Sequence, residues 1–235
     1  TVTNANLSLV DETVSPSSKI ALTKINAYLK EVHAAGTAKV DLSGHLFGAD
    51  QPNLQLTGIA GNPLVNQLLD LKFALKPLDL TALSALATTY GAQLEGTSLS
   101  GPLDLILTVK TRQDTPGVDA SLLLNGKNAA LNYGELFHKE QGTELDLSLN
   151  LSGTIGGKVV LAAKNCTLRL GSNEIEFPWT IDREIRLNDR DASELISGEI
   201  RSKGIDLSEL SKSIPLLVPY NLAGSVIPDL KFKGN

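Results

Sequence analysis

The chain has 235 residues, 42% hydrophobic content, few aromatic residues and a net charge of −5. The hydrophobic content excludes a disordered chain and supports either one large β domain or two modest domains. The negative charge excludes the basic surface that nucleic-acid binding requires. We therefore expect a folded protein that has no nucleic-acid partner.

Membrane-spanning and targeting signals are missing from the sequence as given. No stretch approaches the roughly 18 uninterrupted apolar residues of a membrane-spanning helix, and no signal peptide opens the chain. The first residue is Thr1 and methionine is absent, so we interpret the chain as a fragment of a longer protein. Cys166 is the only cysteine, which excludes an intramolecular disulfide and predicts a packed thiol.

Apolar and polar residues alternate along most of the chain, a pattern that places the two kinds of side chain on opposite faces of a strand. It predicts strands over residues 5–10, 40–47, 54–59, 68–75, 103–110, 118–124, 129–133, 145–151, 159–163, 166–170 and 196–200. A longer alternation runs through Ile175, Phe177, Trp179, Ile181, Ile185 and Leu187. Pro178 within it predicts an edge or a bulge, because proline cannot donate a ladder hydrogen bond.

Three connections in this series predict hairpins. Residues 48–52 link the strands over 40–47 and 54–59, and the dipeptide Asn125-Gly126 is typical of a tight turn between 118–124 and 129–133. The segments 159–163 and 166–170 form the third predicted hairpin. Short turns between successive strands indicate an antiparallel meander, not a parallel α/β sheet.

Two segments allow more than one interpretation. Residues 20–32 fit a helix with one apolar face, which their periodicity favours, or a long strand that continues the sheet. Residues 64–71 could form a turn of helix before the strand over 68–75. Both alternatives stay open at this point.

Two segments, near 78–110 and 204–234, share an order of short helix, turn and amphipathic strand. Asp79 and Asp206 are the predicted N-caps, and Glu209 three residues after Asp206 suggests a capping box. Pro215 should stop the second helix, whose predicted range is 206–214 against 79–90 for the first. The sequence therefore predicts an internal repeat.

The apolar faces of three strands are the main candidates for a functional surface. They consist of Leu103, Leu105, Leu107, Val109, Leu145, Leu147, Leu149, Leu151, Ile175, Phe177, Trp179 and Ile181. Most alternating strands bury such faces in a closed core. The functional alternative is that part of this surface stays open as a groove for acyl chains.

Catalytic and metal-binding patterns are not found. His33, His45 and His138 lie far apart without a partner for a metal or general-base site, and no pair of carboxylates stands out for a glycan hydrolase. We expect a non-enzymatic protein without a cofactor or metal.

The ending of the chain resembles the AsmA-like proteins of Gram-negative bacteria, relatives of TamB and YhdP. The pattern that carries the resemblance is Ile205-Asp206-Leu207-Ser208-Glu209-Leu210, then Pro215, then Leu222-Ala223-Gly224 and a strand. Similar texture occurs in Leu7-Ser8-Leu9-Val10-Asp11 with Pro16, in Val40-Asp41-Leu42-Ser43-Gly44 and in Leu54-Gln55-Leu56-Thr57-Gly58. These motifs are degenerate and cover most of the chain.

The resemblance implies a single mainly β domain over residues 1–235, a long, curved, groove-like antiparallel sheet with a few short helices, and a strand over 20–32. It also implies a periplasmic module, anchored in the inner membrane by a segment outside this chain, that carries phospholipid along a groove toward the outer membrane. Phospholipid or another acyl-chain ligand would be the partner, envelope proteins could be further partners, and membrane contact would come from segments outside the chain. The alternative is a scaffold for outer-membrane protein assembly whose aliphatic faces form a closed core.

Overall fold

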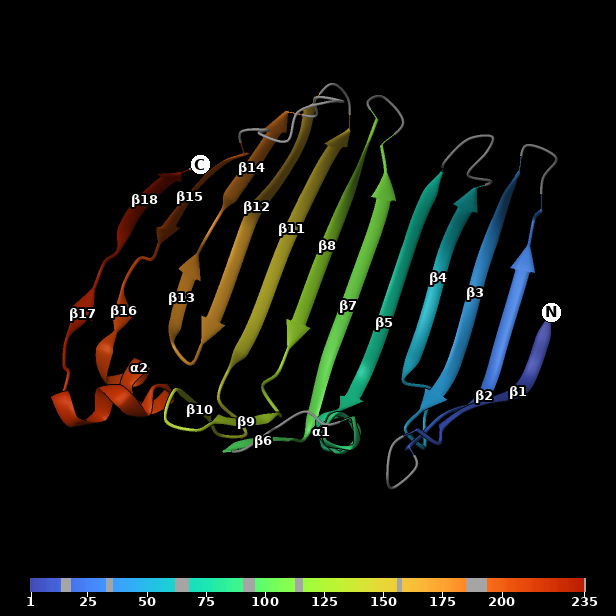
Figure 1. Ribbon diagram of the computed structural model, residues 1–235, viewed down its shortest axis with the longest axis horizontal. Coiled ribbons are helices and arrows are strands. Elements are labelled where there is room, and N and C mark those ends of the chain that lie inside the picture. Colours follow the sequence, from blue (N-terminus) through green and yellow to red (C-terminus); the bar gives the residue numbers. More distant parts are fainter. Residues whose placement is uncertain are drawn as a thin grey trace.

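The structure is a computed structural model that describes residues 1–13, 18–32, 36–61, 68–90, 96–112, 116–155, 158–184 and 194–234. It is mainly β, as the alternating sequence predicts, with one large antiparallel meander and few short helices (Figure 1). The strands of the large sheet are β1 (Val2–Asp11), β2 (Ser18–Lys30), β3 (Thr37–Leu46), β4 (Leu54–Gly61), β5 (Leu69–Asp79), β7 (Pro102–Thr111), β8 (Gly117–Asn125), β11 (Leu145–Ile155), β12 (Lys158–Leu170), β13 (Asn173–Glu176), β14 (Trp179–Glu184), β15 (Glu194–Arg201) and β18 (Asp229–Gly234).

Neighbours along the chain are neighbours in this sheet over most of its width. The order runs β1-β2-β3-β4-β5-β7-β8-β11-β12, after which β14, β15 and β18 continue the sheet and β13 pairs with β12 in line with β14. Residues 20–30 belong to β2, so the strand alternative for this segment is confirmed and the helix is wrong. Residues 69–71 are already strand, which excludes helix there, and residues 62–67 lie outside the described part.

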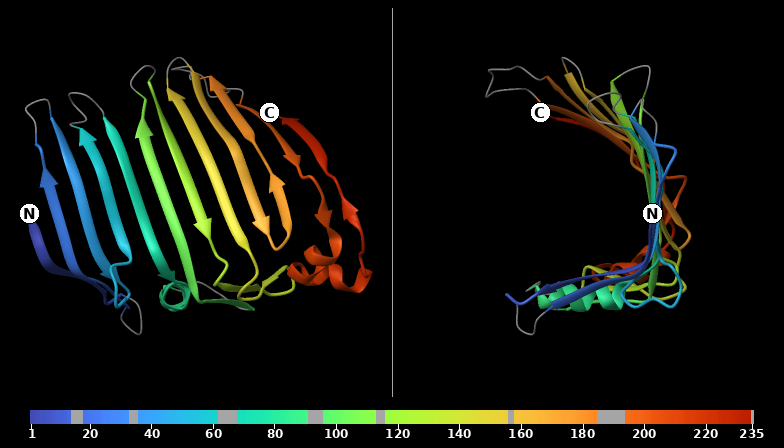
Figure 2. Two further views of the ribbon diagram at one scale, coloured as in Figure 1. Left: turned by 180° about the vertical axis from the view of Figure 1, so that it is seen from behind. Right: turned by 90° about the vertical axis from the view of Figure 1, so that its right-hand side faces the viewer.

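Seen along its length, the sheet has a C-shaped profile (Figure 2). The lower arm of the C contains helix α1 (Leu80–Thr89) and a three-stranded sheet of β6 (Thr97–Ser100), β9 (Ala130–Tyr133) and β10 (Phe137–Lys139). Helix α2 (Leu207–Ser213), the 3-10 helix η1 (Pro215–Tyr220) and the short strand pair β16 (Ile205–Asp206) and β17 (Ser225–Val226) lie at the C-terminal end of the sheet (Figure 1).

The hydrophobic core lies where the large sheet meets this lower arm. Leu78, Leu80, Leu103 and Ala129 are buried together, and the half-buried side chains packed on them include Leu83 of α1 and Leu131 of β9. Elsewhere in the described residues the buried apolar side chains are small: Ala74, Ala162, Ala163 and Cys166. The fold therefore concentrates its core at one end of the strands.

A buried lysine holds β10 against the turn that follows β8. Lys139 of β10 is almost inaccessible to solvent, and its Nζ donates to the carbonyl oxygens of Lys127, Ala129 and Glu140 at 3.3, 2.6 and 3.2 Å. Burial lowers the pKa of this amine. Three carbonyl acceptors satisfy the buried donor group, as a buried ammonium requires.

Two of the predicted hairpins are wrong. β8 does not pair with β9, because the Gly126 N–H donates to the Leu145 carbonyl at 2.7 Å and so extends the β8–β11 ladder. The turn closed by the Ala129 N–H and the Gly126 carbonyl then carries the chain into the lower arm. β8 pairs with β11 over nine residues, whereas β9 has only four residues with which it could pair.

The segments 159–163 and 166–170 are one strand, β12, and not a hairpin. Asn165 takes a left-handed conformation (φ 50°), and the register to β11 shifts between Ser148 and Asn150 at this point. Asn165 and Cys166 together lie opposite Leu149, which makes a β-bulge where a turn was expected. Across from this bulge, Phe177 and Pro178 interrupt the strand between β13 and β14, which confirms the predicted irregularity at this proline. Ile185 and Leu187 of the same predicted alternation lie outside the described residues.

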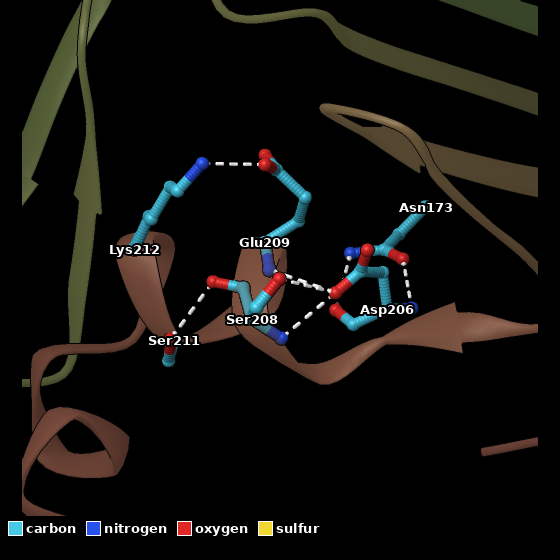
Figure 3. Close-up of polar contacts among 6 residues, drawn as sticks. All are labelled: Asn173, Asp206, Ser208, Glu209, Ser211 and Lys212. Carbon is cyan, nitrogen blue, oxygen red and sulfur yellow. Dashed lines mark hydrogen bonds and ion pairs between the residues drawn. The ribbon is translucent and has the colours of Figure 1, made fainter. Parts of the chain in front are cut away.

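Both predicted N-caps are confirmed. Asp79 accepts hydrogen bonds from the N–H groups of Thr81 and Ala82, at 2.8 and 3.3 Å. Asp206 accepts from those of Ser208 and Glu209, at 2.8 and 3.2 Å, and from the Ser208 hydroxyl (Figure 3). Each aspartate ends a strand and begins a helix, so the two helices start in the same way.

The second half of the expected capping box is not formed. The Glu209 carboxylate pairs with Lys212, and the Asp206 N–H donates instead to the Asn173 side chain at 2.7 Å. The Asn173 amide returns a hydrogen bond to the Asp206 carbonyl, so β13 anchors the start of α2 (Figure 3). Pro215 begins η1 after α2 has ended, as predicted, whereas the expected end of α1 at Gly91 lies outside the described residues.

The Asp206 cap predicts a pH dependence of stability. The Ser208 hydroxyl and the Glu209 N–H hold the pKa of Asp206 below its ordinary value of 3.8. A lowered folded-state pKa contributes stability that is present above the unfolded pKa and is lost as the pH falls through the folded pKa. Asn also caps helices but does not titrate in this range. We therefore expect the denaturation midpoint of the wild type to fall relative to that of Asp206→Asn as the pH drops from about 5 to about 2.

Chemical denaturation at several pH values measures this difference. Comparing the two proteins removes the contributions of other carboxylates, such as Glu174, whose pKa is lowered by Arg169. A constant difference between the two midpoints across the range would contradict the contribution of the cap.

Candidate functional site

The candidate site is one face of the large sheet, which we call the concave aliphatic face. Antiparallel register places the apolar residues of neighbouring strands side by side on it. One row consists of Leu75, Leu105, Leu124, Leu147, Leu168 and Ile175; a second consists of Phe73, Leu107, Leu122 and Leu149; a third consists of Leu71, Val109, Ala120, Leu151, Ala163 and Trp179. Each row therefore crosses several strands without a break in apolar character.

The core cluster shows which side of the curved sheet this face occupies. Leu75, Leu103 and Leu124 belong to the face and pack in the same cluster as Leu80 and Leu83 of α1. Because α1 forms part of the lower arm of the C, on the side toward which the sheet curves, the aliphatic face lines the inside of the C (Figure 2).

Outside the part packed under α1 and β9, no second layer of described residues covers this face. The side chains of Leu105, Leu147, Leu149, Leu151 and Ile175 are only partly buried, and Leu107 is 36% exposed. In a closed β-sandwich the equivalent leucines would be buried against a second sheet about 10 Å away. The apolar surface is instead shielded by neighbouring side chains of the same sheet.

The structure brings most of the predicted residues onto this one face. Leu145 pairs with Leu170 and Ile181 with Leu161, so both extend the rows described above. Leu103 differs, because it is 8% exposed and belongs to the core under α1. Phe177 lies in the link between β13 and β14, half-buried and outside the ladder.

Sequence reasoning missed the residues that complete the surface. Phe73, Leu122 and Leu168 lie directly beside predicted residues, and Leu56 and Leu42 continue the second row onto β4 and β3. Their own alternation was visible in the sequence. Their placement beside the predicted residues needed the strand register, which alternation alone does not provide.

The opposite, convex face is more polar, although Ile106 and Leu123 also lie on it. A shallow hollow there is lined by side chains that include Asp104, Asp146 and Arg169. Arg169 donates to Glu174 at 2.6 Å, which raises the pKa of Arg169 and lowers that of Glu174. Such exposed, mutually compensated charges contribute little to binding or stability. The paired positions of β4, β5, β7, β8 and β11 on the concave aliphatic face carry no ionisable side chain.

The described residues offer no metal centre, although His138, expected to have no carboxylate partner, lies 3.9 Å from Glu140 (Nε2 to Oε1). They contain no group of three histidine, cysteine, aspartate or glutamate side chains that could hold a metal ion. The buried His45 is close to the Ala49 carbonyl (Nδ1 to O, 2.7 Å), whereas His33 lies outside the described residues. Across the described ranges, the helices are also too short or too polar to cross a membrane.

Comparison of the chain with protein-family models, curated proteins and solved structures found no match. The resemblance to AsmA-like proteins therefore stays an expectation drawn from sequence motifs. The proposals below rest on the geometry and chemistry of the described residues.

Substitutions of Leu103 and Leu107 provide a matched test of which leucines are buried in the core and which are exposed to solvent. Both lie on β7 and point to the same face, but Leu103 is 8% exposed and Leu107 is 36% exposed. Leu103→Asp should bury an unpaired carboxylate at a cost of several kcal/mol, against a total stability of about 5–15 kcal/mol. Leu107→Asp leaves the carboxylate in contact with water, so its melting temperature should stay much closer to that of the wild type.

Thermal unfolding followed by circular dichroism compares the two variants. Equal and severe destabilisation by both substitutions would mean that the face around Leu107 is closed in solution.

Proposed function

We propose that the chain is a non-enzymatic, lipid-handling module of a bacterial envelope protein, in which the concave aliphatic face binds acyl chains of phospholipid. The supporting observation is the continuous aliphatic surface that crosses the strands and, outside the part under α1 and β9, is not covered by a second layer of described residues. The resemblance to AsmA-like proteins adds the setting, a periplasmic module anchored by a segment outside this chain that carries phospholipid between the inner and outer membranes.

The physical chemistry of the face fits an acyl chain better than a polar ligand. Burying one methylene group contributes about 0.8 kcal/mol, so a chain of ~16 carbons gains on the order of 10 kcal/mol before ordering costs. The rows of leucine, valine and isoleucine offer this burial, and the paired positions at their centre provide no charge to hold a headgroup. The headgroup would remain in water at the open side of the C.

The similar side chains along the concave aliphatic face also affect how a bound acyl chain could move across it. A ligand held by a deep pocket or a polar anchor must break specific contacts in order to move. Along the rows of the concave aliphatic face, neighbouring positions present similar aliphatic side chains, so the binding free energies at successive positions are similar. An acyl chain can then slide from strand to strand across small barriers, which suits a conduit.

Leu147→Asp tests acyl-chain binding directly. Leu147 lies at the middle of the first row, between Leu124 and Leu168, and is half-buried. If acyl chain completes its burial, the variant should keep its apo fold and lose co-purifying lipid, measured by mass spectrometry beside thermal melting. A collapsed melting temperature, with no lipid on the wild type, would reject this proposal and favour a scaffold with a closed core. Ser148→Asp, on the opposite face of the same strand, is the matched control and should retain lipid.

Trp179 provides an independent optical test. It is the only tryptophan, it is half-buried, and it ends the third row beside Ala163. Fatty acid added to the delipidated protein should displace water from this part of the face and shift the Trp179 emission to shorter wavelength. The emission of Leu147→Asp should respond less at the same fatty-acid concentration. An unchanged wild-type spectrum at saturating fatty acid would argue against acyl-chain binding beside Trp179.

A further inference from the structure

Two aromatic residues lie at the C-terminal end of the concave aliphatic face. Trp179 of β14, Gly198 of β15 and Phe232 of β18 are paired in register, so the three positions form one row on the same face. This row continues the third row of the face, which reaches Trp179 from Ala163 of β12. The chain contains one tryptophan and five phenylalanines, and the register brings two of these six residues together here.

Gly198 makes room for the Phe232 ring. A Cβ at position 198 would lie 2.4 Å from Cζ and 2.9 Å from Cε1 of this ring, closer than a real Cβ atom approaches. The ring therefore reaches from β18 over the backbone of β15 and covers the position at which β15 has no side chain. An aromatic side chain placed over a glycine of the neighbouring strand supplies the apolar contact that the glycine lacks. The row thus continues to β18 without a gap.

The Phe232 ring is accessible to a ligand. Phe232 is 47% exposed, and the next row of the face consists of Leu161, Ile181 and Ile196. Leu161 and Ile196 are 44% and 39% exposed, so this end of the face is open to water. The paired positions of both rows between β12 and β18 carry no ionisable side chain. The surface therefore suits an apolar ligand.

The distance across this end of the face matches the length of one acyl chain. Three strand spacings of about 4.8 Å separate β12 from β18, which gives about 14 Å. One phospholipid tail spans about 15 Å of hydrocarbon. A tail that contacts Ala163 at one end can therefore lie across Trp179 and reach the Phe232 ring.

We propose that Phe232, seated on Gly198, is an acyl-chain-binding residue that completes the concave aliphatic face beyond Trp179. The inference rests on the proposed function, because it assigns a further binding residue to the same site. Gly198 is a positioning residue, since it acts through the ring that lies on it. The acyl-chain site thus includes β18, the last strand of the large sheet.

Quenching of Trp179 emission by a fatty acid with bromine on its chain tests this assignment, because bromine quenches tryptophan only at close range. The delipidated wild type should show saturable quenching. Phe232→Ala should raise the concentration at half-quenching by roughly tenfold, since the tail loses apolar burial against the ring. Leu9→Ala is the matched control: Leu9 is 61% exposed but lies on β1, at the other edge of the sheet, so this variant should titrate as the wild type does.

Gly198→Ala separates the position of the ring from a general change in β18. The added Cβ should displace the ring and raise the half-quenching concentration in the wild-type background, but it should have no effect when Phe232 is already alanine. The same Cβ would lie 3.0 Å from the Pro178 carbonyl oxygen, so melting curves verify that each variant is folded.

Three results would overturn the role of Phe232 and leave the proposed function standing, provided that lipid co-purifies with the wild type. They are an absence of Trp179 quenching, an unchanged half-quenching concentration in Phe232→Ala, and an equal rise in Leu9→Ala. An equal effect of Gly198→Ala in both backgrounds would overturn the seating of the ring on this glycine. A wild type without quenching and without co-purifying lipid would overturn both proposals.

Discussion

The fold depends on a register that keeps aliphatic side chains on one face of every strand of a wide sheet. Because side chains alternate, a slip of one residue between two strands would move a whole set of leucines to the other face. The β-bulge at Asn165 illustrates how the register is maintained. On the C-terminal side of the bulge in β12, Leu168 lies beside Leu147, and on its N-terminal side Ala163 lies beside Leu151. One extra residue in β12 therefore separates two stretches whose apolar residues still face the same side.

A single layer of this width needs stabilisation from sources other than a second sheet. Most of the buried large side chains lie at the lower arm, where α1 and β9 cover Leu78 and Leu103. The remaining strands depend on their ladders and on contact between neighbouring leucines of the same face, each pair contributing roughly 0.2–1 kcal/mol. Lys139 adds a polar anchor between β10 and the turn after β8, and Asn173 of β13 anchors the start of α2. The aliphatic rows can therefore stay accessible without the loss of the whole core.

The sequence was sufficient to predict most of the strands, the two helix starts and the aliphatic character of the candidate site, but it left β2 open between helix and strand and divided β12 in two. Alternation determines which residues of a strand share a face, and an aspartate before a helix has one favourable role, as Asp79 and Asp206 both demonstrate. Pairing was harder to predict because it depends on distant partners. Gly126 is typical of a hairpin, yet its N–H bonds to Leu145, nineteen residues away in the chain. Asn165 tolerates the left-handed conformation in either a turn or a bulge, so local chemistry could not distinguish them.

Both edge strands of the large sheet carry features that disfavour edge-to-edge association. β1 and β18 each pair on one side only among the described strands. β18 carries Lys231 and Lys233, and charged side chains on an edge disfavour unspecific strand addition. β1 exposes Leu7 and Leu9 at its edge, although its ladder to β2 is interrupted by register shifts near Ala5. Irregular pairing of this kind also limits edge-to-edge association.

The width of the sheet places a limit on how one acyl chain can occupy it. Strands lie about 4.8 Å apart, so the distance from β1 to β18 is on the order of 50 Å. A phospholipid tail spans one leaflet, about 15 Å of hydrocarbon. In the proposed function, one tail would therefore cover only about a third of the width of the sheet at any time. A binding protein for a single lipid would need no surface of this length, whereas a conduit needs one that continues beyond each bound tail to the next position.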